Sequence, residues 1–134
     1  TRTQSGLNII QEQIAIDQIT NDIDLARSMA FANHDTITIQ FSTSNGEFDK
    51  SYSIYKGPNS NRILISDFPN SDGGIISLDN YRMRGVEIKS INFNNSYELQ
   101  FIPLGDCDLT SEGSITLNSK TINIEPLTGK WTIN

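Results

Sequence analysis

The sequence has little of the material from which catalytic and metal sites are usually built: it contains one cysteine and one histidine among 134 residues. Because Cys107 stands alone, an internal disulfide and a zinc site made of several cysteines are both excluded. With His34 as the only histidine, a histidine-rich metal centre is excluded and a Ser-His-Asp or Cys-His catalytic arrangement has little basis. We therefore expect no enzyme, no cofactor, no metal ion and no small-molecule substrate.

Long apolar runs and a surplus of basic charge are also missing. No unbroken apolar run approaches the roughly 20 residues that a membrane-spanning helix needs. Lys and Arg number 10 against 16 Asp and Glu, which gives a net charge of −6. General nucleic-acid binders carry a basic surplus instead. We therefore expect neither a membrane span within this sequence nor a general affinity for nucleic acid.

The abundant residues are isoleucine, serine and asparagine, with 20, 15 and 14 copies, whereas valine occurs once. A length of 134 residues matches one domain, since domains typically hold about 100–200 residues. The chain shows no internal repeat and no low-complexity linker. We therefore expect a single acidic domain over residues 1–134.

The first third of the chain predicts one helix. No proline occurs between Ser5 and Asn33, and Gly6 is the only glycine there. Apolar residues recur at spacings of three, four and seven within an arc of about 100°, which is typical of a helix packed on a core. Asn33 and His34 are the expected end of the helix, since Asn tolerates the left-handed conformation found there. The expected core stripe is Ile9, Ile16, Ile19, Ile23, Ala26 and Ala30, and the polar residues outside it are Asp17, Gln18, Asp22, Asp24 and Arg27.

A second apolar stripe, Leu7, Ile10 and Ile14, points in roughly the opposite direction. The predicted helix is about 43 Å long, whereas a compact domain of this size is only about 35 Å across. We therefore expect the N-terminal turns to project beyond the body and the second stripe to face away from the core, toward another molecule. The alternative is a core helix with two buried sides.

After Asp35 the apolar period changes to two, which is typical of half-buried strands. Asn45-Gly46 and Asn94-Asn95 are strong hairpin-turn signals. One long helix followed by six to eight short strands predicts an α+β domain in which the helix packs on antiparallel sheet. The expected strands are 36–42, 48–56, 62–66, 85–93, 97–104, 114–117, 121–124 and 130–133.

Two clusters of polar residues could carry chemistry. The segment from Asp106 to Glu112 places three carboxylates and two hydroxyls in a predicted loop, and hard cations prefer oxygen ligands of this kind. Its spacing lacks the pattern of an EF-hand, so an acidic hairpin loop is the favoured interpretation. Tyr81, Arg82 and Arg84 form the main basic cluster and could hold a phosphate backbone, but the net charge of −6 favours a solvated surface or a patch for a charged partner.

Two segments resemble the minor pilins and minor pseudopilins of the GspH/FimT type. The first is Asp24-Leu25-Ala26-Arg27-Ser28-Met29-Ala30 running into 36–39, which is similar to the stretch where that family's helix ends and its first strand begins. The second is the tail, which is similar to the family's F-x-P-x-G, G-x-I-x-L, I-x-I and T-G succession of closing strands. These motifs stand here at 101–105, 113–117, 122–124 and 128–129.

The resemblance implies a pilin-like fold and a non-catalytic subunit that assembles, primes or caps a type IV pilus or a type II secretion pseudopilus. It also implies an N-terminal leader and a hydrophobic anchor helix that this sequence does not contain. The protein would then be anchored in the inner membrane, with its domain in the periplasm or outside the cell. Its partners would be other pilins, whose helices would cover Leu7, Ile10 and Ile14.

The resemblance also suggests an alternative function, a ligand-binding or adhesion module at a pilus tip. Some relatives bind DNA during uptake through basic residues late in the chain. Here that region offers only Lys120 and Lys130, with Glu125 between them. Binding of nucleic acid is therefore not expected, and Arg82 and Arg84 would be its candidates if it occurred.

Overall fold

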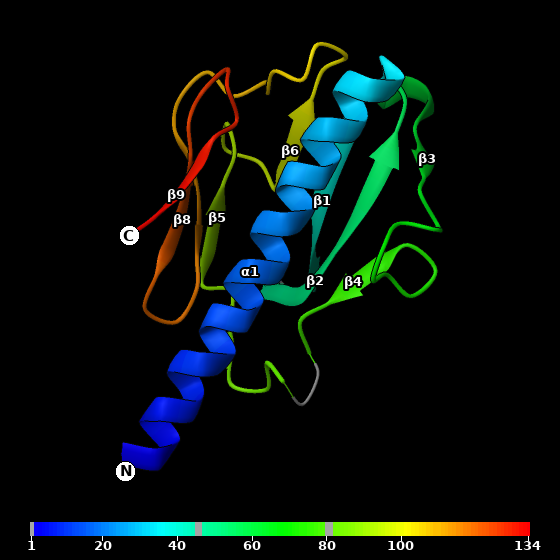
Figure 1. The fold of residues 1–134 in the computed structure, drawn as a ribbon. Helices are drawn as coiled ribbons and strands as arrows, with labels where there is room; N and C mark the ends of the chain where they lie inside the picture. The colour runs from blue at the N-terminus through cyan, green and yellow to red at the C-terminus, as the bar shows by residue number, and fades with distance from the viewer. Residues whose placement is uncertain (1, 45–46, 80–81) are drawn as a thin grey trace.

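The computed structural model describes residues 2–44, 47–79 and 82–134. Helix α1 (Arg2–Asn33) crosses the body diagonally, and its N-terminal turns extend beyond the body (Figure 1). The expected long helix packed on antiparallel sheets is confirmed. The elements that follow are β1 (Ile37–Ser44), β2 (Glu47–Lys56), the 3-10 turn η1 (Asn59–Asn61), β3 (Ile63–Leu64), β4 (Ile75–Ser77), β5 (Ser90–Asn92), β6 (Glu98–Phe101), β7 (Gly113–Thr116), β8 (Thr121–Ile124) and β9 (Trp131–Ile133).

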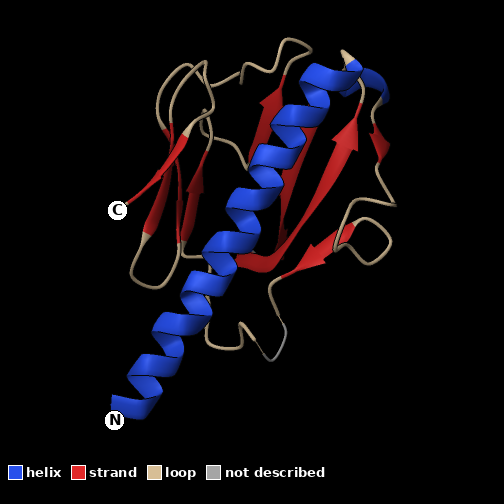
Figure 2. Cartoon of the chain, viewed as in Figure 1, coloured by secondary structure: helices blue, strands red, loops and turns tan. Residues whose placement is uncertain are grey.

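The strands form two antiparallel sheets. In Figure 2 the first sheet lies behind the helix and to its right, and the second lies to its left. The first sheet has the order β3-β2-β1-β6, and β4 pairs with another part of β2. In its centre, Ile39 lies opposite Ile54 and Leu99. The second sheet has the order β5-β7-β8-β9, with Ile115 opposite Ile122. These isoleucines and Leu99 are buried in one core that the two sheets share with α1.

The buried face of α1 follows the expected stripe from residue 16 onward. The five stripe residues from Ile16 to Ala30 are at most 2% exposed. Ile9, which the spacing also placed in this stripe, is 62% exposed, so that part of the prediction is wrong. The reason is that helical spacing predicts direction only, and at residue 9 the helix has already passed the edge of the sheets.

The helix ends where the sequence predicted. Asn33 is its last residue, and His34 has a positive φ of 49°. The amide of Asp35 donates to the carbonyl of Ala30 at 3.2 Å. This bond together with the left-handed residue makes a Schellman motif, which satisfies a carbonyl that the helix leaves open.

Asp22 corrects another expectation, since its spacing placed it outside the apolar stripe and it is nevertheless 3% exposed. Its Oδ2 accepts a 2.6 Å hydrogen bond from the Tyr52 hydroxyl of β2 and a 2.9 Å bond from Nε2 of Gln18. Burial raises the pKa of Asp22 above its ordinary value, and these two hydrogen bonds offset only part of that rise. The contact fixes α1 to the first sheet through one buried carboxyl group.

The predicted strand over 85–93 is largely wrong, since only Ser90–Asn92 pair as β5. At Gly85 and Glu87 the backbone bonds to the Asn118 side chain instead of to a strand. Oδ1 of Asn118 accepts from the amide of Glu87 at 2.7 Å, and its Nδ2 donates to the carbonyl of Gly85 at 2.7 Å. Strand β4, in contrast, was not predicted. Of the two hairpin turns, Asn94 and Asn95 both have positive φ as expected, while Asn45-Gly46 lies outside the described residues.

The T-G motif near the end of the chain has a steric cause. Gly129 has a φ of +72°, and a Cβ added there would lie 2.8 Å from Cε1 of the buried Phe101. A left-handed conformation costs an L-residue about 1–2 kcal/mol, and overpacking costs about 1–3 kcal/mol. Both effects favour glycine at this position.

We therefore expect Gly129→Ala to lower the free energy of unfolding by about 2–5 kcal/mol. Gly73→Ala is the matched control, because Gly73 has a φ of +64° but no atom within 4 Å of the added Cβ. The control should lose only the backbone share, about 1–2 kcal/mol. Urea unfolding of the two variants measures both losses, and equal losses would contradict the contact with Phe101.

Asp22→Asn should gain stability relative to the parent as the pH rises above 3.8, the ordinary pKa of Asp. The folded parent holds this proton more tightly than the unfolded chain, so its stability falls as the pH rises through the interval between the two pKa values, and the loss persists at higher pH. Asn cannot ionise and keeps an oxygen acceptor for Tyr52. The difference should grow by up to about 1.4 kcal/mol per pH unit within that interval. Urea unfolding from about pH 3 to about pH 7 measures it, and a constant difference would refute the raised pKa.

Candidate functional site

Helix α1 leaves the body at Gln11 and Glu12, where two polar side chains bind neighbouring loops. The Glu12 carboxylate accepts hydrogen bonds from the Ser119 hydroxyl at 2.6 Å, the Ser119 amide at 2.8 Å and the Lys120 amide at 3.1 Å. Oε1 of Gln11 accepts from the amide of Gly85 at 3.1 Å. We call Glu12 with the turn 118–120 the exit clamp, because it holds the helix at the last point where the body supports it.

The exit clamp favours an ionised Glu12 although the residue is only 3% exposed. Burial by itself raises the pKa of Glu12. The hydrogen bonds from Ser119 and Lys120, together with the positive charge of Lys120, outweigh burial and hold that pKa below its ordinary value. Glu12 and Asp22 are thus two buried carboxyl groups on one helix whose pKa values move in opposite directions.

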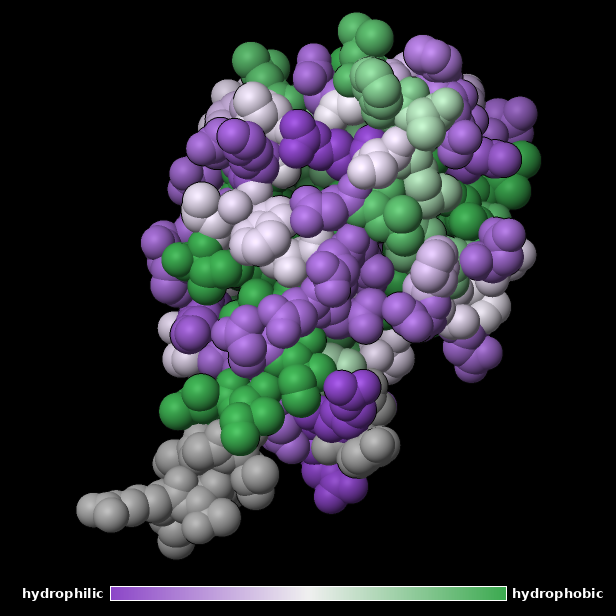
Figure 3. Space-filling model, in the orientation of Figure 1, coloured by the Kyte–Doolittle hydropathy of each residue, from purple (hydrophilic) through white to green (hydrophobic). Residues whose placement is uncertain are grey.

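Beyond the exit clamp the helix exposes neighbouring apolar side chains. Ile9 is 62% exposed and Ile10 is 57% exposed. Figure 3 shows apolar side chains gathered over this end of the described surface, below the polar middle of the body. The side chain of Leu7 lies outside the described residues. The structure therefore presents one surface, Ile9 and Ile10, which we call the exit patch.

Ile14 behaves differently from the expectation that it faces away from the core. It is partly buried, packs against the core, and lines a groove with Ile76 and Met83. The earlier expectation is wrong because the chain between β4 and β5 covers that side of the helix. Ile14 therefore does not belong to the exit patch.

The structure does not show whether the basic cluster of Tyr81, Arg82 and Arg84 forms one site. Tyr81 lies outside the described residues, and Arg82 and Arg84 are exposed. Arg82 lines the groove beside α1 together with Asp17 and Ile14. Nζ of the nearby Lys89 donates instead to the carbonyl of Asn118 at 3.0 Å.

The loop from Asp106 to Glu112 holds its acidic residues in separate roles. An Asp108 oxygen accepts a long 3.4 Å bond from the amide of Gln100, while Asp106 and Glu112 are exposed. Within 2–44, 47–79 and 82–134, no three His, Cys, Asp or Glu residues lie close enough to hold a metal ion. The thiol of Cys107 is buried and donates to the carbonyl of Glu125 at 3.4 Å, and burial raises its pKa.

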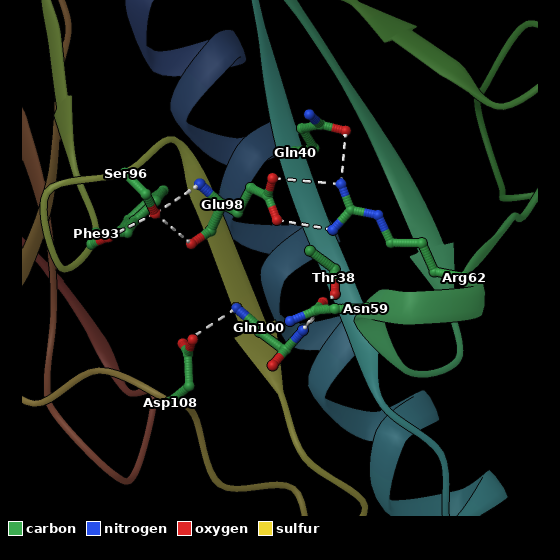
Figure 4. Close-up of polar contacts among 9 residues, drawn as sticks. All are labelled: Thr38, Gln40, Asn59, Arg62, Phe93, Ser96, Glu98, Gln100 and Asp108. Atoms are coloured by element: carbon green, nitrogen blue, oxygen red, sulfur yellow. Dashed lines mark hydrogen bonds and ion pairs between the residues drawn. The ribbon is translucent and has the colours of Figure 1, made fainter.

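The outward face of the first sheet carries a polar network that the sequence did not reveal (Figure 4). Arg62 forms a two-pronged ion pair with Glu98, at 2.7 and 3.3 Å, and its Nη2 donates to Oε1 of Gln40 at 3.2 Å. The Arg62 guanidinium also lies 4.9 Å from the ring centre of Tyr55. These side chains satisfy one another across β2, β1 and β6, so this face uses its polar groups internally.

Within the described part of the chain, no helix combines the length and the apolar character needed to cross a membrane. The one long helix, α1, instead carries polar side chains around much of its surface.

The fold is similar to that of two crystal structures of the type IV minor pilin FimU from Pseudomonas aeruginosa, strain PAO1. The first has 19% sequence identity and a TM-score of 0.61, over 91% of this chain and 87% of that chain. The second, from another crystal form, has 18% identity and a TM-score of 0.60, over 91% of both chains. The chain has the fold of a minor pilin. No protein-family model and no curated protein sequence matches the chain.

Glu12 is the residue of the exit clamp that the sequence interpretation missed. It precedes Ile16 by four residues, so helical spacing places it within the core stripe. A carboxylate inside an apolar stripe is a signal for a buried, hydrogen-bonded acid. Its partners in the turn 118–120 could not be found in this way, since they lie more than 100 residues away in sequence.

We expect Glu12→Gln to lower the free energy of unfolding by about 1–3 kcal/mol at neutral pH, because the hydrogen bonds from Ser119 and Lys120 would lose their charged acceptor, and the Gln amide nitrogen could no longer accept from the Ser119 hydroxyl. Because the pKa of Glu12 is lowered in the folded protein, its ionised form stabilises the parent at pH values above 4.5, the ordinary pKa of Glu. This stabilisation is lost as the pH falls through the lowered pKa of the folded state. The difference between variant and parent should therefore shrink in acid. Glu87→Gln is the control, since Glu87 is exposed and no bond to its carboxylate is seen in the described chain. Urea unfolding against pH measures both, and an equal loss in the control would contradict the exit clamp.

Proposed function

We propose that the chain is the globular domain of a minor pilin or minor pseudopilin, a non-catalytic subunit of a type IV pilus or a type II secretion pseudopilus. The observation that carries this proposal is the exit patch on a helix that continues beyond the body. Ile9 and Ile10 expose apolar surface that the domain itself does not cover, and water disfavours such surface at about 25 cal/mol per Å². Packing against the helices of neighbouring subunits would bury it.

The pilin-type fold supports this assignment. FimU, whose fold is similar, is a type IV minor pilin. A helix that is fixed to its own domain at one end and bare at the other suits a subunit that joins a bundle through the bare end. Subunits related by one repeated, non-closing contact build filaments.

The exit clamp would give the projecting helix a defined direction. Glu12 and Gln11 bind the body through four hydrogen bonds at the point of exit. A helix held there transmits the orientation of the domain to the segment beyond it. We infer that this segment leads to an anchor in the inner membrane, with the domain in the periplasm or outside the cell.

A catalytic role has no support in the geometry. In the described part of the chain, no hydrogen bond joins His34 to a serine, threonine or cysteine side chain. We propose that the protein acts by contact alone, in priming, assembling or capping the filament.

In the full-length protein, expressed in the organism that carries it, we expect Ile9→Asp combined with Ile10→Asp to abolish incorporation into filaments. Both side chains are more than half exposed, so the domain itself should keep its thermal stability. Two charges in a helix bundle would cost several kcal/mol without partners. Sheared filaments are collected by centrifugation and probed for the subunit with an antibody.

The control is Ile63→Asp combined with Ile75→Asp, which alters two isoleucines that are 62% and 51% exposed on edge strands of the first sheet. This variant should enter filaments normally. The proposal fails if the exit-patch variant appears in filaments at the parental level, or if the control is excluded to the same extent.

A further inference from the structure

The end of the molecule opposite the exit patch also exposes large apolar side chains. Phe31 in the last turn of α1 is 63% exposed, Leu104 is 69% exposed and Leu127 is 67% exposed. Figure 3 shows apolar side chains at this end of the described surface as well, above the polar middle of the body. We call Phe31, Leu104 and Leu127 the distal patch. Phe31 follows Ile9 by 22 residues on one helix, so the two patches lie about 33 Å apart along its axis.

A β-turn presents Leu104 at this end. The amide of Gly105 donates to the carbonyl of Ile102 at 2.8 Å, which leaves Pro103 and Leu104 at the two central positions of the turn. Proline fixes its own φ near the value that the first central position requires. Leu104 and Gly105 line a groove together with Phe31, and a Cβ added to Gly105 would lie 3.5 Å from Cβ of Phe31. The turn and the end of the helix are therefore packed side by side.

A strained turn presents Leu127. The amide of Thr128 donates to the carbonyl of Pro126 at 2.7 Å, and Leu127 between them has a φ of +67°, which makes a γ-turn of the rare kind. A bulky side chain is uncommon at positive φ, where Gly, Asn and Asp are favoured. The amide of Cys107 donates to the carbonyl of Leu127 at 2.7 Å and ties this turn to the segment that follows the Leu104 turn. Backbone strain of this kind clusters at binding surfaces, so an exposed leucine held in it indicates a partner.

The charges beside the distal patch narrow the choice of partner. Two acidic residues and one basic residue line the groove, and one residue of each sign flanks the turn of Leu127. In that order they are Asp24, Asp106, Arg27, Glu125 and Lys130. The acidic surplus disfavours an anionic membrane, a nucleic acid, or a second distal patch placed face to face with the first. The distal patch therefore favours an apolar partner that carries no acidic residue.

The projecting segment of this same chain has that chemistry. Residues 1–11 contain Arg2 and no acidic residue, and the exit patch exposes two isoleucines beyond the body. Because the two patches lie at opposite ends of one helix, a contact between them is head-to-tail and leaves a free patch at each end of the pair. Such a contact can repeat without closing, which builds a filament.

We propose that the distal patch of one subunit binds the exit patch of a second copy of this chain. The exit patch packs in the groove between Phe31 and Leu104, with Leu127 at its rim. This inference rests on the proposed function, because it names the surface that receives the exit patch within the filament.

The first test is chemical cross-linking in filaments of the full-length protein, using a flexible bis-maleimide on sheared filaments. Ile10→Cys combined with Leu104→Cys should give dimers and longer oligomers on a denaturing gel. Each single variant should remain monomeric, and so should the parent, whose Cys107 is buried. Dimers from either single variant would reveal like-to-like contacts and overturn the proposal. A double variant that yields no oligomers would overturn it as well.

The second test removes the leucines without adding charge. Leu104→Asn combined with Leu127→Asn should reduce the amount of subunit in sheared filaments at least tenfold. The melting temperature should not fall, since both side chains are exposed and Asn adopts a positive φ more readily than Leu. The control is again Ile63→Asp combined with Ile75→Asp, which should enter filaments normally.

The two proposals fail in different ways. If the Ile9→Asp, Ile10→Asp variant is excluded from filaments while the double Asn variant enters at the parental level, the proposed function stands and the distal contact is overturned. If the Ile9→Asp, Ile10→Asp variant itself enters normally, the proposed function fails, and the distal contact fails with it.

Discussion

Helix α1 rises about 48 Å over its 32 residues, which exceeds the roughly 35 Å width of a compact domain of 134 residues. Only part of such a helix can be buried by its own chain. From Ile16 to Ala30 the apolar stripe packs on the sheets, and at Ile9 a residue of the same stripe is exposed. The same hydrophobic pattern thus builds the core at one end of the helix and a contact surface at the other.

Two buried carboxyl groups hold this helix in place. Asp22 binds Tyr52 of the first sheet, and Glu12 binds the turn 118–120 of the second. Their environments differ: Asp22 receives two side-chain bonds, whereas Glu12 receives backbone amides and a nearby positive charge. Backbone amides and cations favour the ionised form. The helix is therefore tied to one sheet by a group that resists ionisation and to the other by a group that favours it.

The two sheets also use their outward faces in different ways. Arg62 and Glu98 join three strands of the first sheet into a closed polar network. The outward side chains of the second sheet are short and uncharged within its strands, and Glu125 and Lys130 follow in the next row. The first face thus joins its strands through side-chain contacts, whereas the second makes few such contacts.

The sequence by itself determined the helix, its end at His34 and most of the short strands, because periodicity and turn residues act over a few neighbours. The pilin-like class of fold was implied only by the resemblance of its motifs to a known family. It did not reveal that Ile14 is covered, that Asp22 is buried or that the segment 85–89 bonds to Asn118, because each depends on which distant segment lies alongside. Only the tertiary structure decided where the body ends along α1. That boundary, and not helical spacing, separates the core residue Ile16 from the exposed Ile9.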